Sequence, residues 1–445
     1  MNTWKEVATR FGLEPDRYVD FEYLLYLPLD DEYVVNYVRF QLGLEDPVIK
    51  HRIRKHAQFW RTITDLPWLL DIVENGVALP FEKEPPVIVL PNNKSAVAAD
   101  MVPWVRNTIK EYLAYGFVTR VATVPKCVLP LQVKNTGGKT ALIYDMSVLN
   151  EYIAKKKFKL ESWEEMFNYA CGSGLGIKFD LKKFYHEIDI KEEEQCFFGF
   201  MYQMDDASDH EYFTWATVPY GYTRAPFVAK SIMKPLVTRW RRMGIRIVVF
   251  YDDGMAVGNV GQDLRRAALQ IQCDLLRAGL VPGVGKCTWV PTPVIAWNGL
   301  VFDFLKKGIS VMSHRLDHTN EKMRELLENW PRVSYRHISQ FLGQLNSMHP
   351  VLMGQATLRS KMLQTIVNIR HFNGYSWDDT VKVDGQGLLE QAKLELLFWQ
   401  ANLPGMNFRP FEEKATEWYA WVDASDVAVG GVLVELVPGG DPMYL

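Results

Sequence analysis

The residues that stand out for their chemistry are aspartates that follow apolar segments. Asp252 and Asp253 come directly after the strand-like segment 245–251, and the Asp-Gly pair that follows predicts a two-residue hairpin turn. Asp180 ends a second apolar segment, residues 176–179. Alone, each feature has a plain alternative, a polar turn for Asp252-Asp253 and a strand-end cap for Asp180.

If the two segments are neighbouring strands of one sheet, the three carboxylates converge. Such a cluster is repulsive unless cations neutralise it. Oxygen ligands with open positions suit Mg²⁺, which takes its remaining ligands from water and phosphate. Two such ions about 3.5–4 Å apart can stabilise the attacking and leaving oxygens of a phosphoryl transfer. The pattern therefore indicates metal-dependent phosphate chemistry.

The elements that position these aspartates follow from hydrophobic spacing. Helices are expected over residues 102–116, 226–243 and 263–278, the last closed by Gly279, with a further helical segment after Ser162. Strands are expected over residues 117–124, 128–133, 141–144, 176–181, 195–201 and 246–251, with a turn at Gly137-Gly138. Helices and strands that alternate in mixed order predict an α+β fold.

The flanking segments have a different pattern. Residues 51–76 show apolar positions near helical spacing, and Pro85-Pro86 indicates an extended linker. Past residue 300 helices are expected over 314–330, 334–349, 357–372 and 388–401. The segments 417–424 and 429–437 near the end of the sequence are expected to pair as β-strands.

Bulk composition does not indicate a nucleic-acid binder, because the 445 residues have a net charge of −3 and 48% of them are hydrophobic. The charge is unevenly placed, however. Residues 230–246 contain six basic residues and no acid, whereas residues 187–211 contain nine acids and Lys191 as their one Lys or Arg. A near-neutral total therefore leaves room for phosphate contacts on the basic surface.

The five cysteines form no CxxC pair, which argues against a zinc knuckle and favours a reducing compartment. No apolar segment reaches the roughly 18–20 residues of a membrane span, and the first residues lack the apolar core of a signal peptide. We therefore expect an intracellular protein, cytoplasmic or nuclear, without a membrane partner.

Five segments in order resemble the consecutive palm motifs of reverse transcriptases. They are FDLKKFYHEI (179–188), VPYGYTRAPF (218–227), FYDD (250–253), GLVPGVGKC (279–287) and WNGLVFD (297–303). The resemblance covers roughly residues 100–303 and is closest to the DIRS-like and LTR-type retrotransposon polymerases. It implies a right-hand polymerase fold with fingers, palm and thumb.

The resemblance also implies roles for single residues. Asp180, Asp252 and Asp253 would hold two Mg²⁺ ions, or Mn²⁺ in their place, with Asp252 the stronger ligand of the hairpin pair. Lys286 would protonate the leaving pyrophosphate, and a solvated surface lysine is the alternative. Trp297 and Gly299 match the primer-grip hairpin, where the alternative for Trp297 is a core side chain.

By the same resemblance, the nucleotide site would be formed by residues of the first two motifs, namely Leu181, Lys183, Phe184, Tyr185, Tyr220 and Gly221. Tyr185 matches the aromatic steric gate that excludes a ribose 2′-hydroxyl. The backbone N–H groups of Lys183 and Phe184 would face the triphosphate, although the family usually has a small residue at Phe184. A core tyrosine and a turn glycine are the plain alternatives for Tyr185 and Gly221.

The segment 142–150, with Asp145 and Asn150, resembles the fingers motif of the family. It departs from the family at two positions, because Ala141 and Ser147 stand where many relatives have a phosphate-binding Arg. Lys139 or Lys134 could supply the missing cation, and a decayed copy is the alternative.

The expected organisation has four parts. Residues 1–95 are a partly helical leader, 96–303 the fingers and palm, 304–410 a helical thumb and connection, and 411–445 the start of a ribonuclease H-like domain. Asp423 matches the first metal-binding acid of that domain. Its later carboxylates are missing from the sequence, so ribonuclease H activity is not expected and a truncated product is one interpretation.

The function expected from these observations is RNA-directed DNA polymerisation. A primer 3′-hydroxyl on an RNA or DNA template would be extended with dNTPs. A catalytically decayed scaffold that binds nucleic acid or protein, and a metal-dependent nuclease, are the alternatives. The sequence does not indicate an oligomeric state.

Overall fold

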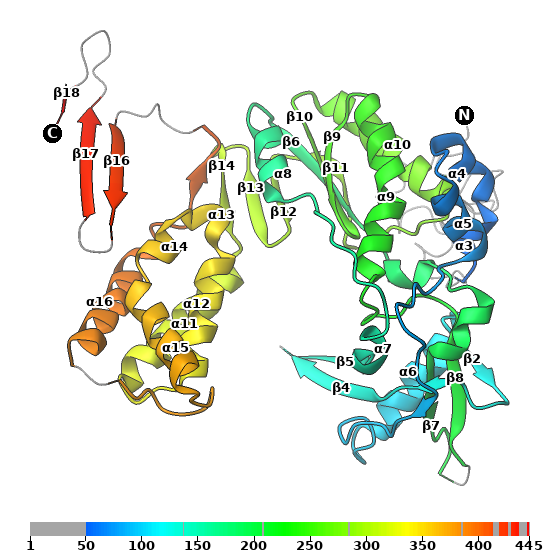
Figure 1. Cartoon of the computed structure of the whole chain (residues 1–445). Coiled ribbons are helices and arrows are strands. Elements are labelled where there is room, and N and C mark those ends of the chain that lie inside the picture. Colours follow the sequence, from blue (N-terminus) through cyan, green and yellow to red (C-terminus); the bar gives the residue numbers. More distant parts are fainter. Residues whose placement is uncertain are drawn as a thin grey trace. The chain divides into compact units, whose positions relative to one another are not determined.

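The computed structural model describes residues 50–136, 138–206, 209–283, 285–383, 386–412, 418–425, 429–435 and 443–444. The chain divides into two compact units, Met1–Phe304 and Leu305–Leu445. Both helices and strands are abundant, as expected for an α+β protein (Figure 1). No helix in these described ranges has the length and apolar character needed to cross a membrane.

The aspartates belong to a four-stranded antiparallel sheet in the first unit. Its strand order is β11-β6-β10-β9. The strands are β6 (Leu175–Asp180), β9 (Arg246–Phe250), β10 (Asp253–Gly258) and β11 (Thr288–Thr292). Three helices pack on this sheet, namely α8 (Trp163–Ala170), α9 (Ala225–Arg242) and α10 (Gly261–Arg277) (Figure 1). Strands β6 and β9 and the three helices lie close to the ranges expected from hydrophobic spacing, whereas β11 was not among the expected strands.

The helix ends have clear local causes. Ser162 and Glu165 form a capping box at the start of α8. Gly279 follows the end of α10 with φ +80°, a left-handed conformation that glycine adopts without strain. Its N–H donates to the carbonyl of Leu276 at 3.0 Å. The helix end expected at Gly279 is confirmed.

A second sheet and a hairpin form another part of the first unit. The sheet has the order β1-β3-β7-β8-β2, and β4 pairs with β5. The elements are β1 (Ile88–Val89), α6 (Val102–Ala114), β2 (Val118–Val121), β3 (Cys127–Val128), β4 (Leu131–Thr136), β5 (Lys139–Tyr144), α7 (Ser147–Asn150), η3 (Phe184–Glu187), η4 (Glu192–Phe197), β7 (Gly199–Tyr202) and β8 (Glu211–Trp215). The hairpin expected around Gly137-Gly138 is confirmed for its strands, while Gly137 lies outside the described residues.

The strand expected over residues 195–201 is wrong in its first half. Residues Glu192–Phe197 form the 3₁₀ helix η4, and β7 begins only at Gly199. Three consecutive glutamates open η4, where the unpaired backbone N–H groups of a helix favour negative charge. The acidic residues therefore start a helical turn before the apolar residues pair in the sheet.

Residues of the leader pack into the same hydrophobic core as the four-stranded sheet. The single helical segment expected over 51–76 is divided into α3 (Arg52–Lys55), α4 (Ala57–Ile63) and α5 (Pro67–Asn75), the last with Pro67 in its first turn. Trp60 is fully buried, and its indole N–H donates to the carbonyl of Ala278 at 3.0 Å. The leader thus covers the end of α10.

The second unit is mainly helical. Helices α11, α12, α15 and α16 pack on one another, and two strands, β14 and β15, pair antiparallel. The elements are β14 (Gly308–Val311), α11 (Ser313–Asn329), α12 (Tyr335–Ser347), α13 (His349–Leu352), α14 (Gln355–Leu358), α15 (Lys361–Asn373), α16 (Gln386–Asn402) and β15 (Arg409–Pro410). The one helix expected over 357–372 is instead two, because Ser360 leaves the helical conformation between α14 and α15.

The expected β-pair near the end of the sequence is present. Strands β16 (Trp418–Ala424) and β17 (Val429–Glu435) pair antiparallel, with Asp423 opposite Gly430, and β18 (Met443–Tyr444) extends the pair to three strands. The hairpin resembling the start of a ribonuclease H domain therefore forms as a β-structure.

Candidate active site

The three aspartates come together at one end of the β6–β10 pair. Asp253, the first residue of β10, lies directly opposite Asp180, the last residue of β6. Residues directly opposite each other in an antiparallel pair share a face of the sheet, so these two carboxylates point the same way. The N–H of Leu181 donates to the carbonyl of Asp252 at 2.8 Å. The expectation that the two strands are neighbours is confirmed.

The hairpin turn lies two residues earlier than the Asp-Gly pair predicts. Phe250 pairs with Asp253, so Tyr251 and Asp252 form the turn, and Tyr251 has the left-handed φ of +58°. The Asp-Gly pair belongs to strand β10 instead. A Cβ atom on Gly254 would come within 2.3 Å of the Phe179 ring. The glycine is therefore required for close packing against Phe179, and the prediction of an Asp-Gly turn is wrong.

The pKa values of Asp252 and Asp253 are higher than those of ordinary aspartates. Burial, followed by the charge of Asp180, raises the pKa of Asp252. Burial raises the pKa of Asp253 to about 7. The charge of Lys178 opposes this rise, and the charges of Asp180 and Asp252 add to it. Crowded, half-desolvated carboxylates of this kind are stabilised by an added cation.

The donor set fits a hard divalent cation. Two carboxylates share one face of the sheet and a third lies in the adjoining turn, which provides oxygen ligands of the type that Mg²⁺ prefers. Within the described ranges, no three Asp, Glu, His or Cys side chains, including these aspartates, are arranged so that they could hold a metal ion by themselves. The fit therefore rests on the chemistry and charge of the donors, with water and phosphate supplying the remaining ligands.

Gly283 and Cys287 hold the backbone of Asp180. The N–H of Gly283 donates to the Asp180 carbonyl at 2.6 Å, and the N–H of Asp180 donates to the Cys287 sulfur at 3.4 Å. Lys286 places its Nζ 3.0 Å from Asp180 Oδ1 while its side chain remains 67% exposed. Sequence reasoning found Lys286 but missed Cys287, whose position next to Lys286 was the one available signal.

Tyr185 and Tyr220 stand beside the carboxylates. Their rings meet edge to face at a centroid distance of 5.1 Å. Burial, then the neighbouring Tyr251 and Asp252, raises the pKa of Tyr185, and burial with Asp252 raises the pKa of Tyr220 to about 12. Both hydroxyls are thus neutral at physiological pH. The structure brings both tyrosines to the aspartate cluster.

The other residues of the first motif contribute differently. Leu181 and Phe184 are buried, so their side chains belong to the core. Lys183 adopts a left-handed φ of +51°, and its Nζ lies 2.5 Å from a carboxylate oxygen of Glu111 on α6. Within the described ranges, the backbone N–H groups of Lys183 and Phe184 donate to no backbone carbonyl.

Gly221 is fixed by the fingers motif. It has φ +106°, and a Cβ there would approach the carbonyl oxygen of Tyr144 to 2.8 Å. The Asn150 side chain donates to the Gly221 carbonyl at 2.8 Å and accepts from the N–H of Thr223 at 3.0 Å. Asn150 thus links the two motifs, and only glycine fits at position 221.

The structure also describes Ala141 and Ser147, the two positions where many relatives have a phosphate-binding Arg. Ala141 on β5 lies directly opposite Lys134 on β4, so the exposed Lys134 shares a face of the hairpin with it. Lys139 begins β5 with its backbone opposite Thr136, and its side chain lies outside the described atoms. Ser147 donates its hydroxyl to Asp145 at 2.5 Å. Lys134 is therefore a cation that shares a face of the hairpin with Ala141.

Trp297 and Gly299 belong to the hairpin of β12 (Val294–Trp297) and β13 (Leu300–Asp303). Asn298 and Gly299 form its two-residue turn, both with positive φ. Trp297 is 1% exposed, and its indole N–H donates to the carbonyl of Asp253 at 3.4 Å. Trp297 is thus a core residue that also ties this hairpin to the aspartate cluster.

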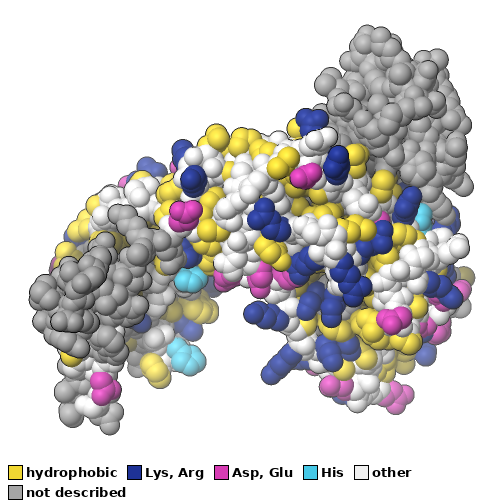
Figure 2. All heavy atoms as spheres, turned by 90° about the horizontal axis from the view of Figure 1, so that it is seen from above, with side chains coloured by type: hydrophobic (Ala, Val, Ile, Leu, Met, Phe, Trp, Pro, Cys, Tyr) yellow, Lys and Arg dark blue, Asp and Glu magenta, His cyan; other side chains and the backbone are white. Residues whose placement is uncertain are grey.

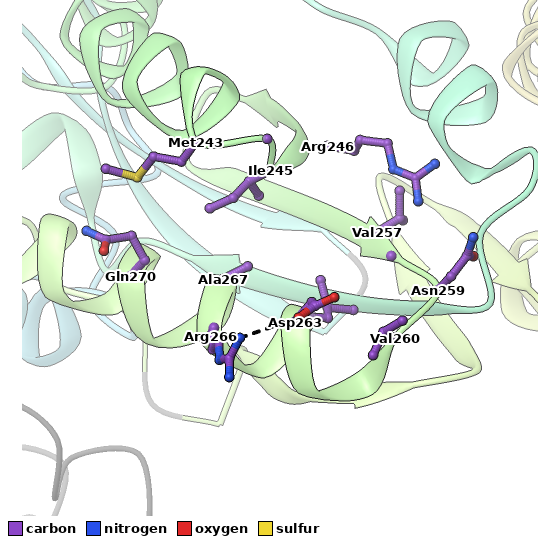
Figure 3. Close-up of a pocket in the computed structure, with 13 residues that line it drawn as sticks. Met243, Ile245, Arg246, Val257, Asn259, Val260, Asp263, Arg266, Ala267 and Gln270 are labelled. Atoms are coloured by element: carbon purple, nitrogen blue, oxygen red, sulfur yellow. Dashed lines mark ion pairs between the residues drawn. The ribbon is translucent and has the colours of Figure 1, made fainter.

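A separate hollow of about 440 Å³ lies at the opposite end of β10 (Figure 3). Met243 and Gln270 lie at one end of it, and Arg246 and Asn259 at the other (Figure 3). Its lining includes Val257 and none of the candidate site residues. The hollow is therefore distinct from the aspartate site.

The aspartate site lies inside a segment with a recognised family. Residues 136–302 match the family model described as reverse transcriptase (RNA-dependent DNA polymerase). The chain is also 20% identical over 375 residues to the Transposon Tf2-3 polyprotein of Schizosaccharomyces pombe, a match that covers 84% of this chain and 25% of the polyprotein. It is 22% identical over 214 residues to the genome polyprotein of Petunia vein clearing virus, covering 47% of this chain and 9% of that protein.

Solved structures share the fold. A foamy viral protease-reverse transcriptase in complex with dsDNA has a TM-score of 0.56 at 14% identity, covering 83% of this chain and 71% of that one. The foamy viral enzyme in complex with an RNA/DNA hybrid has a TM-score of 0.55 at 12% identity, covering 92% and 51%. The predicted polymerase fold is confirmed.

The chain matches 25% of the length of the Tf2 polyprotein. The motif order, the paired aspartates and the family match agree with one another. Residues 136–302 therefore match the reverse transcriptase family model, and the chain is similar to the polyproteins of a retrotransposon and of a plant virus.

Proposed function

We propose that this protein is an RNA-directed DNA polymerase that extends a primer 3′-hydroxyl with dNTPs. The observation that carries the proposal is the register that places Asp253 opposite Asp180, with Asp252 in the adjoining turn, inside the reverse transcriptase segment. In the reaction the primer 3′-oxygen bonds to the α-phosphorus of the dNTP while the bond to pyrophosphate breaks.

Asp180, Asp252 and Asp253 would hold two Mg²⁺ ions, with Mn²⁺ as a substitute. Bound there, divalent cations lower the pKa of an attacking hydroxyl and stabilise charge on a leaving phosphate. The raised pKa values of Asp252 and Asp253 support this assignment, because they show carboxylates that lack full neutralisation by the protein itself.

The protein's own groups would position the nucleotide. The backbone N–H groups of Lys183 and Phe184 would face the triphosphate, and the half-buried ring of Tyr185 would pack against the sugar, where a 2′-hydroxyl would clash. Lys286, next to Asp180, would deliver a proton to the pyrophosphate oxygen. Lys134 would supply the cation that Ala141 lacks.

The partners would be a template with a primer, of RNA or DNA. The solved relatives bind dsDNA and an RNA/DNA hybrid. Lys and Arg side chains gather on one face of the first unit, where phosphates would be attracted (Figure 2). We also propose that residues 96–303 act as fingers and palm, 304–410 as thumb and connection, and that the β16–β17 hairpin corresponds to the start of a ribonuclease H domain.

Primer extension tests the proposal. Purified protein should extend a DNA primer on an RNA template with dNTPs when Mg²⁺ or Mn²⁺ is present, and chelation should stop it. Protein that binds primer-template but extends it under neither metal would favour the scaffold alternative. Degradation of the template instead of extension would favour the nuclease alternative.

Tyr185→Ala tests the steric gate. Removing the ring opens space at the sugar, so the ratio of rNTP to dNTP incorporation should rise by about 10-fold or more, the size of a discrimination worth 1.4 kcal/mol. The ratio is measured from single-nucleotide insertion kinetics, with Tyr185→Phe as the matched control because it keeps the ring. An unchanged ratio in Tyr185→Ala would remove Tyr185 from this role.

A further inference from the structure

A stripe of side chains on α9 separates two hollows of the first unit. Lys230, Lys234 and Thr238 follow one another at intervals of four residues, so they lie on one face of the helix. One hollow, of about 290 Å³, extends from this stripe to Tyr251 in the aspartate turn. The other, of about 630 Å³, extends from the stripe to α4 and α5 of the leader. The stripe lines both hollows.

The free cations lie on the leader side of α9. Lys234 and Arg242 are exposed and form no ion pair within the described ranges. Their neighbours on the same helix are neutralised, since Arg239 pairs with Asp274 and Arg241 pairs with Glu161. The lining of this hollow also includes the half-buried Lys230 and one exposed acid, Asp65, so cations outnumber carboxylates on this surface.

An aromatic side chain stands beside these charges. Trp68 of α5 lines the same hollow and is 44% exposed, which is unusual for so large an apolar side chain. Its ring stacks on Phe227 of α9 with a centroid distance of 6.1 Å and an interplanar angle of 16°. Thr62, Thr64 and Thr238 add hydroxyl groups to the lining. Phe227 thus supports Trp68 in a fixed, accessible position.

We propose that this leader-side surface, defined by Trp68, Lys234 and Arg242, binds a single-stranded segment of nucleic acid. Exposed cations neutralise phosphates, and an exposed aromatic ring stacks on unpaired bases, which is the combination that single strands require. A duplex keeps its bases stacked on one another and offers no base to Trp68. The inference rests on the proposed function for the source of the strand, since the stripe leads from this surface to the hollow at Tyr251.

The test is binding of a labelled, unstructured oligouridylate of about 12 nucleotides, within the length that one such surface covers. Fluorescence anisotropy is measured in chelator, without dNTPs, over a range of salt. Removing two phosphate contacts in Lys234→Gln/Arg242→Gln should weaken binding and reduce the slope of log K against log salt by about 1.4. The matched control Arg265→Gln/Arg277→Gln removes two exposed charges from α10 and should leave the slope unchanged.

Trp68→Ala should weaken binding by about tenfold without a change in the salt slope, because stacking carries no charge. Trp68→Phe keeps an aromatic ring and should recover most of the affinity. Thermal unfolding of each variant separates loss of binding from loss of fold. Wild-type affinity in both Trp68→Ala and Lys234→Gln/Arg242→Gln would overturn the proposal, as would an equal loss in the α10 control.

Two further arms identify the ligand. Primer-templates with long and short unpaired template overhangs show whether the strand is the template overhang, in which case the long overhang binds tighter only when Trp68 is present. If the free oligouridylate alone depends on Trp68, a separate strand is the ligand. An equal dependence of a blunt duplex on Trp68 would contradict single-strand binding.

Asp252→Asn distinguishes this inference from the proposed function. That variant should bind the oligouridylate like the wild type and fail to extend a primer. If the wild type does not extend a primer but its binding of oligouridylate still depends on Trp68, the binding surface is supported and the polymerase proposal is disproved. If the wild type extends a primer but no variant changes oligouridylate binding, the polymerase proposal stands and the binding surface is disproved.

Discussion

Two regions of the first unit bury carboxylates and treat them in opposite ways. Asp274 on α10 is fully buried, and its Oδ2 accepts hydrogen bonds from the side chains of Arg239 and Trp240, each at 3.0 Å. The cluster of Asp180, Asp252 and Asp253 contains three acids but has an ion pair only from the exposed Lys286 in the described structure.

The difference distinguishes Asp274, which has a structural role, from the three clustered aspartates, whose charge the protein leaves largely uncompensated. At Asp274 the protein supplies donors to one carboxylate oxygen, and the side chains of Arg239 and Trp240 thereby link α9 to α10. At the aspartate cluster burial and mutual repulsion raise the pKa values of Asp252 and Asp253, which costs stability in the free protein. Such a cost is expected at functional sites, where the missing charge comes from a ligand.

Exchanging Asp252 and Asp274 for asparagine should give opposite results. Asp252→Asn removes a proposed metal ligand, so the extension rate should fall by about a thousandfold or more. The free energy of unfolding should stay the same or rise. Asp274→Asn should keep extension but lose about 1.5–3 kcal/mol of unfolding free energy, the value of hydrogen bonds to a charged group. Single-turnover extension and urea unfolding measure the two effects.

His186 extends the comparison to a buried group that the fold keeps neutral. Its ring is stacked between Phe117 and Trp215, and burial lowers its pKa to about 3 from 6.5. A base with a depressed folded pKa contributes stability that is complete above its unfolded pKa and is lost as the pH falls toward the folded pKa. The loss between about pH 7 and pH 5 should be about 2 kcal/mol.

His186→Phe keeps a stacked ring without a titrating group and should remove that part of the acid sensitivity. Urea unfolding of both proteins at the two pH values isolates the contribution, because other groups, including Glu187, cancel in the difference. An equal change with pH in both proteins would contradict the assignment.

Gly254→Ala tests whether the aspartate strand depends on close packing. The new Cβ would overlap the Phe179 ring at 2.3 Å, so the unfolding free energy should fall by about 1–3 kcal/mol. Gly258→Ala in the same strand is the matched control, since its Cβ would meet Leu264 at an ordinary 3.6 Å. Similar losses in both variants, measured by thermal unfolding, would count against the Phe179 contact as the cause.

Lys134→Gln should have the smallest effect. If Lys134 replaces the missing arginine near the triphosphate, its removal should raise the KM for dNTPs by about fivefold, as for one solvent-exposed ionic contact worth about 1 kcal/mol, with little change in kcat. Lys110→Gln on the exposed surface of α6 is the control. A KM equal to that of the wild type would mean that the nucleotide site has no cation at this position.

Much of the site could be predicted from the sequence because its signals are local. The apolar segments before Asp180 and Asp252 predicted two strands, and the strands do pair. The register could not be predicted, since the preference of Asp-Gly for a turn was overruled by packing of Gly254 under Phe179, a residue 75 positions away in the chain. The result moved the turn to Tyr251 and Asp252.

Contacts between distant segments were also beyond the sequence. Nothing in the spacing of Cys287 indicates that its sulfur accepts the N–H of Asp180, and nothing in Asn150 alone shows that it holds Gly221. Likewise, the apolar positions of the leader predicted helices but not that Trp60 would bond to the end of α10. Helical spacing identifies a buried face and leaves its partner undetermined.

The most direct test of the account is primer extension by the wild type, Asp252→Asn and Asp274→Asn on one RNA template in Mg²⁺, at a temperature where all three are folded. The account predicts extension by the wild type and by Asp274→Asn, and none by Asp252→Asn. Extension by Asp252→Asn at the wild-type rate would contradict the assignment of the uncompensated aspartates as the catalytic centre.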